Sequence, residues 1–163
     1  MIRRAFKYKK HQELMKLRRN AFYFLALATL LLPCVSHAEL GGNAASILSE
    51  QKEFSSQLSN SQQSGVTVYT QTLPSGIVIQ EYLSGNGTIF AVTWTGAALP
   101  NLQTLLGNYF QDYLTAIKES RRSVYLSNEN VIIQSSGMMG AFQGFAFLPK
   151  QAPTGFTPNN LAQ

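Results

Sequence analysis

The sequence predicts an α+β fold: an antiparallel β-sheet of about five to six strands that opens with a three-stranded meander, with one main amphipathic helix packed on one face. Two observations support it. Three short alternating segments between Val66 and Trp94 are separated by glycine-containing turns, and apolar residues recur at helical spacing from Pro100 to Glu119. Strand-like segments resume after the helix, so we expect one α+β domain over residues 65–149.

Residues 1–38 have the composition of a signal peptide. Eight of the 13 basic residues precede position 20, and an apolar run from Ala21 to Leu32 follows that is too short to span a membrane. Ser36-His37-Ala38 then supplies the small side chains that a signal peptidase requires. We expect translation to begin at the first residue or at Met15, and cleavage after Ala38. The product would be a periplasmic or extracellular protein without a membrane span.

Removal of residues 1–38 changes the chemistry that is available. Residues 39–163 carry five basic and seven acidic side chains, a net charge of −2, where the whole chain has +5. Nucleic acid is therefore not an expected partner. Cys34, His11 and His37 are the only cysteine and histidines, which excludes a Ser-His-Asp triad, a Cys-His dyad and a zinc site after cleavage. We expect no catalytic residue, no cofactor and no metal site.

Residues 39–64 are expected to form an N-terminal arm and a polar linker. The first part has helical spacing, with Ile47, Phe54 and Leu58 on one stripe. Ser55 to Ser64 is dominated by Ser, Gln and Asn, the composition of a solvated segment that buries too little surface to fold alone.

Two turns predict the register of the meander. Leu73-Pro74-Ser75-Gly76-Ile77 is typical of a three-residue hairpin loop, which places Leu73 opposite Ile77. Asn86-Gly87 is the strongest two-residue hairpin signal, a type I′ turn with both residues at positive φ. This second turn places Leu83 opposite Phe90.

Propagating these registers divides the meander into two faces, because side chains alternate with period two. The face expected in the core carries a carboxylate, Glu81, in the middle of the central strand between Tyr69 and Val92. Burial there would raise the pKa of Glu81 unless Tyr69, Arg121 or Arg122 donates a hydrogen bond. Two further polar residues, Thr67 and Gln71 of the first strand, share this face. Its apolar members are Leu73, Ile77, Ile79, Trp94, Tyr69, Val92, Leu83 and Phe90.

Pro100 to Glu119 is expected to be the main helix. Its apolar stripe needs a partner, and the apolar sheet face is the only large one available. Gly107 lies at the edge of this stripe. Because glycine costs about 1 kcal/mol relative to alanine inside a helix, we expect a close backbone approach there.

Three strands and a tail are expected after this helix. The strands are Ser123 to Leu126, Asn130 to Ser135 and Ala141 to Leu148. Residues 150–163, which contain three of the proline and glycine residues that interrupt regular structure, are expected to be irregular or disordered.

An ordered set of motifs resembles a known family. The motifs are Leu40-Gly41-Gly42, Leu73-Pro74-Ser75-Gly76, Glu81-Tyr82, Gly87 to Trp94, Pro100-Asn101-Leu102, Leu106 to Phe110, and Ser136-Gly137-Met138 with Ala141-Phe142. They resemble proteobacterial secreted proteins catalogued as domain of unknown function 2844. The resemblance covers nearly all of residues 39–163. It implies a bacterial envelope location, with no assigned activity and no functional residues to carry over.

The sequence favours an exported, non-enzymatic protein that binds another cell-envelope component, such as an envelope protein. The leader supports this, and so do the 13 aromatic residues after position 38, which should exceed what one helix can cover. The alternative is a small-ligand-binding module with a pocket between helix and sheet near Glu81 and Trp94, with Tyr69 as a further contact. A weaker alternative is a carboxylate-dependent hydrolase that uses Glu81 and Asp112. Glu81 is either functional or structurally paired, and nothing in the sequence sets an oligomeric state.

Overall fold

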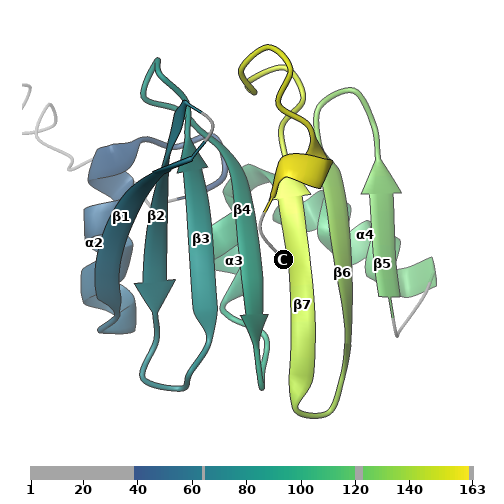
Figure 1. Ribbon diagram of the computed structural model, residues 1–163. Helices are drawn as coiled ribbons and strands as arrows, with labels where there is room; N and C mark the ends of the chain where they lie inside the picture. Colours follow the sequence, from purple (N-terminus) through teal and green to yellow (C-terminus); the bar gives the residue numbers. More distant parts are fainter. Residues whose placement is uncertain (1–38, 64, 120–122, 162–163) are drawn as a thin grey trace, which may run out of the picture. The chain divides into compact units, whose positions relative to one another are not determined.

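A computed structural model describes residues 39–63, 65–119 and 123–161. Within them, seven strands form one antiparallel sheet in the order β1-β2-β3-β4-β7-β6-β5, and the helices lie behind the sheet in the view of Figure 1. The α+β class and the antiparallel sheet are confirmed, but the sheet has seven strands where about five to six were predicted. The predicted signal peptide, residues 1–38, lies outside the described residues.

The strands after the helices extend the meander into one sheet, because β7 inserts between β4 and β6. In the described part of the chain, no helix is long and apolar enough to cross a membrane. The strands are β1 (Gln57–Gln63), β2 (Val66–Thr72), β3 (Val78–Leu83), β4 (Ile89–Gly96), β5 (Ser123–Ser127), β6 (Ile132–Met138) and β7 (Ala141–Phe147). The helices are α2 (Ala44–Phe54), α3 (Leu102–Leu106) and α4 (Phe110–Glu119), with 3₁₀ turns η2 (Gly107–Tyr109) and η3 (Pro158–Asn160).

The polar segment that was expected to be a linker forms an edge strand. β1 pairs with β2 along its whole length, from Gln57 opposite Thr72 to Gln63 opposite Val66. Main-chain hydrogen bonds hold such a strand, although most of its side chains are exposed. Composition reports side-chain burial and not main-chain pairing, so the strand could not be recognised from its Ser, Gln and Asn content.

The first predicted turn is confirmed and the second is wrong. Leu73 N donates to Ile77 O at 2.9 Å, and Gly76 has φ of 80°. In the second turn Ser84 N donates to Thr88 O at 2.9 Å, which leaves a three-residue loop. Gly87 has positive φ, but Asn86 does not, so the turn is not type I′.

The longer loop shifts one residue of the predicted core face. Leu83 pairs with Ile89 and not with Phe90, and the register shifts between Tyr82 and Leu83. Phe90 consequently joins the apolar cluster on the opposite face, together with Tyr82. The other predicted apolar members remain in the two clusters on the helix side, with Ile79 opposite Trp94 as expected.

The predicted helix from Pro100 to Glu119 is interrupted at Gly107. α3 ends there, and Gly107 has φ of 51° and ψ of −120°, a conformation that residues with a Cβ rarely adopt. The buried leucines of α3 and Tyr113 of α4 share one apolar cluster with Ile79 and Trp94 of the sheet. The single predicted helix is thus two short helices, α3 and α4, separated at Gly107 by the 3₁₀ turn η2, and α2 completes the helical layer.

Gly107→Ala is expected to destabilise the protein by about 1–3 kcal/mol. A Cβ at this position would overlap the side chain of Glu39, and the positive φ adds backbone strain. Urea denaturation followed by far-UV circular dichroism measures the loss. Gly85→Ala is the matched control, because Gly85 has no atom within 4 Å of its Cβ position and its φ is not positive. Equal stability of the two variants would contradict the packing of Glu39 on Gly107.

The C-terminal tail packs on the face of the sheet that the helices leave open. Phe156 lies edge-on to Tyr82 and Phe90, with ring centroids 6.0 and 5.0 Å apart. Leu161 is 6% exposed and belongs to the same cluster. η3 crosses in front of β7 in Figure 1. The described part of residues 150–163 therefore has little regular structure, yet it covers the aromatic residues that one helical layer cannot reach.

Candidate functional site

Glu81, Tyr69 and Trp94 are the contacts that the sequence predicts. Glu81 is 1% exposed and lies on the helix side of the sheet, opposite Tyr69 and Val92, so the predicted register is confirmed at this residue. Tyr69 is half-buried beside it. Trp94 is 2% exposed and pairs with Gly144 of β7. The structure thus makes Tyr69 a direct cross-strand neighbour of Glu81, and Trp94 is not one.

A buried carboxyl cluster, consisting of Glu50, Ser56, Gln71 and Glu81, surrounds the predicted residue. Gln71 Nε2 donates to Glu81 Oε2 at 2.9 Å and to Glu50 Oε2 at 3.2 Å. Ser56 Oγ donates to Gln71 Oε1 at 2.7 Å. Each of the four is 8% exposed or less, and Glu50 Oε1 has no hydrogen-bond partner within the described residues. One amide therefore joins α2, the start of β1, β2 and β3.

Burial keeps protons on this cluster. Desolvation, and next the charge of Glu81, raises the pKa of Glu50 from 4.5 to about 9, although the Gln71 hydrogen bond lowers it. Desolvation raises the pKa of Glu81 from 4.5 to about 7 against the same lowering effect of Gln71. The ion pair found in the described residues joins Lys150 to Glu129, far from either carboxyl in sequence, and it is exposed. Glu50 is therefore protonated at neutral pH.

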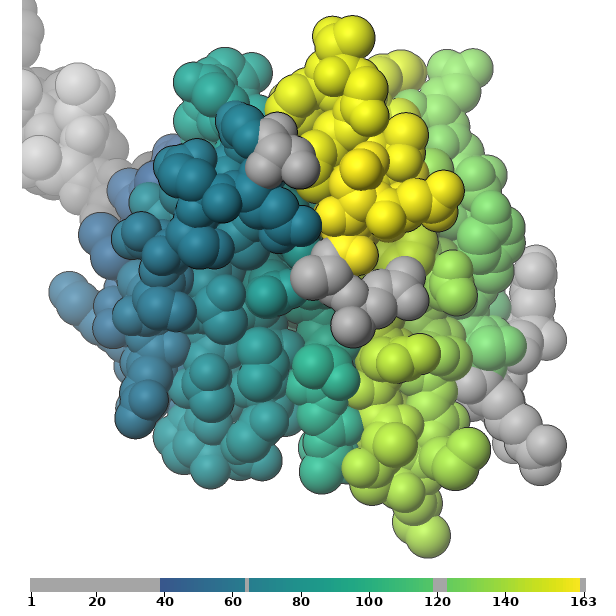
Figure 2. Space-filling model, viewed as in Figure 1, coloured from purple at the N-terminus to yellow at the C-terminus, as the bar shows by residue number. Residues whose placement is uncertain are grey.

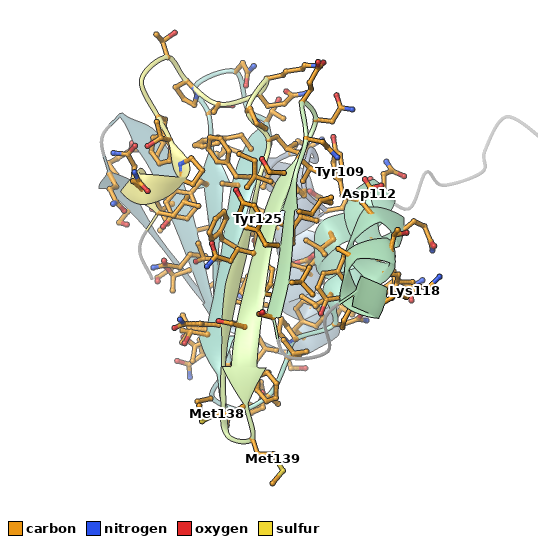
Figure 3. All side chains as sticks on the ribbon, turned by 90° about the vertical axis from the view of Figure 1, so that its right-hand side faces the viewer. Tyr109, Asp112, Lys118, Tyr125, Met138 and Met139 are labelled. Carbon is orange, nitrogen blue, oxygen red and sulfur yellow. The ribbon has the colours of Figure 1, made fainter. Side chains whose placement is uncertain are left out.

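The geometry of the cluster fits a structural role, in which its hydrogen bonds join α2 to the sheet. Its carboxyl groups are sealed from solvent, and the two arginines considered as partners of Glu81 lie outside the described residues. Asp112, which the hydrolase alternative pairs with Glu81, is exposed on α4 (Figure 3). The carboxyl group that shares Gln71 with Glu81 is that of Glu50. Among the described residues no group of three or more His, Cys, Asp or Glu side chains could hold a metal ion.

Glu50, Ser56 and Gln71 were missed as site residues, although two of them left a signal. Glu50 follows Ile47 by three positions, which places it on the buried stripe of the same helix. Gln71 lies two residues after Tyr69 in β2, so both side chains point to the core face. The buried stripe of α2 and the core face of β2 both point to the layer that contains Glu81, so these patterns indicate that Glu50 and Gln71 could lie near it.

A hollow of about 210 Å³ lies on the outer face of the sheet, which we define as the face opposite the helices. Because strand side chains alternate, Gln80 and Thr93 point away from the side that buries Glu81. The predicted pocket between helix and sheet is therefore not where this hollow lies, although Trp94 is among its lining residues. The lining includes Val78, Gln80, Thr95, Gln134, Gln143 and Phe145.

Figure 2 shows the outer face. The described strands place no charged side chain on it. Glu81 is the one charged residue that the seven described strands contain, and it lies on the inner face. Gln80 Oε1 accepts hydrogen bonds from Tyr82 at 3.3 Å and from Thr93 at 3.4 Å. The Gln134 and Gln143 side chains are exposed and make no hydrogen bond to the described residues. The hollow consequently offers neutral donors and acceptors to a ligand.

Comparison with known proteins gives a family and no nearer relative. A family model described as "Protein of unknown function (DUF2844)" matches residues 36–161. No curated protein and no solved structure matches the chain. The matched region contains all seven strands, the buried carboxyl cluster and the outer hollow.

Proposed function

Since the chain belongs to the DUF2844 family, we propose that it is an exported, non-enzymatic protein that binds another component of a bacterial envelope through the outer face of its sheet. The observation that carries this proposal is the uncharged outer face with its hollow. Interspersed charged side chains on the surface of a soluble protein give it protection against association with other molecules. A wide strand surface of Gln, Ser and Thr lacks that protection and offers a place for a neutral partner.

The structure of residues 39–41 supports export with cleavage after Ala38. Leu40 N donates to Leu105 O at 3.1 Å, and Gly41 N donates to Ile89 O at 2.8 Å. Leu40 is also 3% exposed. The chain is thus tied into the domain within two residues of the proposed cleavage position. Either start, at the first residue or at Met15, gives the same mature protein in the periplasm or outside the cell.

The outer face presents mainly polar groups to a partner, because most of the large aromatic side chains on this face are packed against one another. Phe156 of the tail packs on Phe90, which in turn packs on Phe147, so these rings form no exposed apolar patch. The large apolar side chains that remain exposed include Tyr125 and Met138, which stand at the β5 and hairpin edges of the sheet (Figure 3). A partner would meet amides and hydroxyls along the strands, with Val78 and Phe145 inside the hollow and the large exposed apolar side chains at the rim.

A small-ligand-binding module is the second candidate, and the outer hollow is the observation that favours it. The hollow replaces the pocket near Glu81 as the place for such a ligand, since Glu81 is sealed in the carboxyl cluster. The two candidates share one surface. They differ in whether the ligand is a separate small molecule or a part of a larger envelope component.

Expression of the full chain in a Gram-negative host tests export. We expect the protein in the periplasmic or extracellular fraction, with Glu39 as its first residue by mass spectrometry. Ala38→Arg should block processing, because signal peptidase needs a small side chain there. An unprocessed wild-type protein in the cytoplasm would overturn the export proposal.

Co-sedimentation of the processed protein with purified, insoluble envelope material tests binding. We expect Gln143→Lys to weaken retention at least about tenfold, since an unpaired charge would be desolvated in the interface. Gln111→Lys is the control, because Gln111 is exposed on α4 in the other layer. Retention that is absent in the wild type, or that falls equally in both variants, would contradict binding through the outer face.

A further inference from the structure

We propose that the outer hollow binds one sugar ring of a neutral saccharide. This inference rests on the proposed function and supplies its ligand class. The hollow is smaller than the roughly 300–1,000 Å³ of sites that enclose a whole drug-sized ligand. It suits one residue of a longer chain, with the remainder of that chain lying across the outer face.

Cross-strand pairing places the lining residues in two rows. In the first row Phe145 lies in the middle, with Thr93 on one side and Gln134 on the other. In the second row Gln143 stands between Thr95 and Ser136. Gln80 and Val78 of β3 extend the two rows at one end, and Tyr125 and Ser123 of β5 extend them at the other.

The rows match the hydrogen-bonding character of a sugar. A glutamine amide donates and accepts, and so does each hydroxyl group of a saccharide. Gln134 and Gln143 have no partner within the described residues, and Gln80 uses its Oε1 on Tyr82 and Thr93, which leaves its Nε2 as a donor. Three amides therefore surround one hollow from three different strands.

An aromatic floor and rim complete the site. Phe145 is 6% exposed at the base of the first row. Tyr125, the next member of that row, is 70% exposed beside Gln134. The C–H faces of a sugar ring are apolar and pack on aromatic surfaces, while a tyrosine hydroxyl can bond to the ring's polar edge.

The absence of charge on the strands argues against other ligand classes. Anionic groups such as phosphate or carboxylate are bound by Arg or Lys, and the outer face of the described strands has neither. An extended peptide binds a sheet by adding to an exposed edge. The hollow lies over β3, β4, β7 and β6, each of which already pairs with a strand on both sides.

Titration of the processed protein, residues 39–163, with cellohexaose, maltohexaose and chitohexaose tests the inference, with hexagalacturonate as the anionic counterpart. Binding is followed by calorimetry and by the emission of Trp94, the only tryptophan of the chain, which lines the hollow. We expect saturable binding of at least one neutral oligosaccharide at micromolar to millimolar concentration, and no binding of hexagalacturonate. The double variant Gln134→Ala/Gln143→Ala should weaken binding about tenfold or more, since two hydrogen bonds are lost.

Gln111→Ala on α4 is the matched control and should bind as the wild type does. The melting temperature of each variant is measured first, so that a loss of binding is not caused by unfolding. Saturation by none of the neutral oligosaccharides would overturn the inference. Binding that survives the double variant, or equal binding of hexagalacturonate, would also overturn it. Envelope retention that depends on Gln143 without any saccharide binding would remove the saccharide and leave the proposed function standing.

Discussion

The free energy of unfolding is expected to fall as the pH rises from about 5 to about 9, which is opposite to the trend in a protein whose carboxylates form salt bridges. The buried carboxyl cluster is the cause. Burial raises the pKa of Glu50 to about 9 and that of Glu81 to about 7, each from 4.5. A folded-state pKa above the unfolded value means that the folded protein holds protons that the unfolded chain has released.

The pH window follows from these two pKa values. Stabilisation by the cluster is complete below about pH 4.5, where both states are protonated, and it is lost as the pH rises through the folded-state pKa values. Each carboxyl that is protonated only in the folded state lowers the free energy of unfolding by about 1.4 kcal/mol per pH unit. The decline is steepest up to about pH 7, where both groups contribute, and Glu50 alone continues it to about pH 9.

Urea denaturation at several pH values across this window measures the effect. Glu50→Gln keeps a neutral side chain of the same shape, so it should match the wild type at the acidic end. At about pH 9 it should be more stable by up to about 6 kcal/mol, the loss that Glu50 accumulates at about 1.4 kcal/mol per pH unit between its unfolded and folded pKa values. Asp112→Asn, at an exposed position on α4, should leave the slope unchanged. A wild-type stability that is constant or rises with pH would contradict a protonated cluster.

The first hairpin and the second differ in how far the sequence could predict them. Pro74 and Gly76 allow one loop, and it is the loop that forms. Gly87 has positive φ in both the two-residue and the three-residue loop, so the glycine does not decide between them. Ser84 decides, because its hydroxyl bonds to the Asn86 side chain and to Thr88 O and so holds the longer loop.

The candidate site was predictable where it depends on one strand and not where it depends on docking. The burial of Glu81 follows from the alternation of β3. The burial of Glu50 depends on where α2 packs against the sheet. The residues around Glu50 in the sequence are polar, which is why this segment was predicted to be a solvated arm. The outer hollow depends on the insertion of β7 between β4 and β6, which places Gln143 and Gln134 around the same hollow as Gln80, far from it in sequence.

Gly144→Ala is expected to destabilise the fold by about 2–4 kcal/mol, more than Gly107→Ala does. Gly144 pairs with Trp94 across β4 and β7. A Cβ at Gly144 would overlap the indole ring and crowd the carbonyl oxygen of Gln134. Trp94 is 2% exposed within the core, and the β6–β7 pairing fixes the carbonyl of Gln134. The extra methyl group must therefore displace a strand or the core.

A double-mutant cycle with Trp94→Leu separates this clash from a general effect of alanine in a strand. Trp94→Leu alone should cost about 2–4 kcal/mol through lost packing. Adding Gly144→Ala to it should cost less than Gly144→Ala does in the wild type, because the smaller side chain leaves space for the methyl group. Far-UV circular dichroism follows unfolding in all four proteins, and Gly85→Ala serves again as the neutral control. If Gly144→Ala alone does not fold, recovery of folded protein in the double variant reports the same coupling. Strictly additive losses would contradict the packing of Trp94 on Gly144.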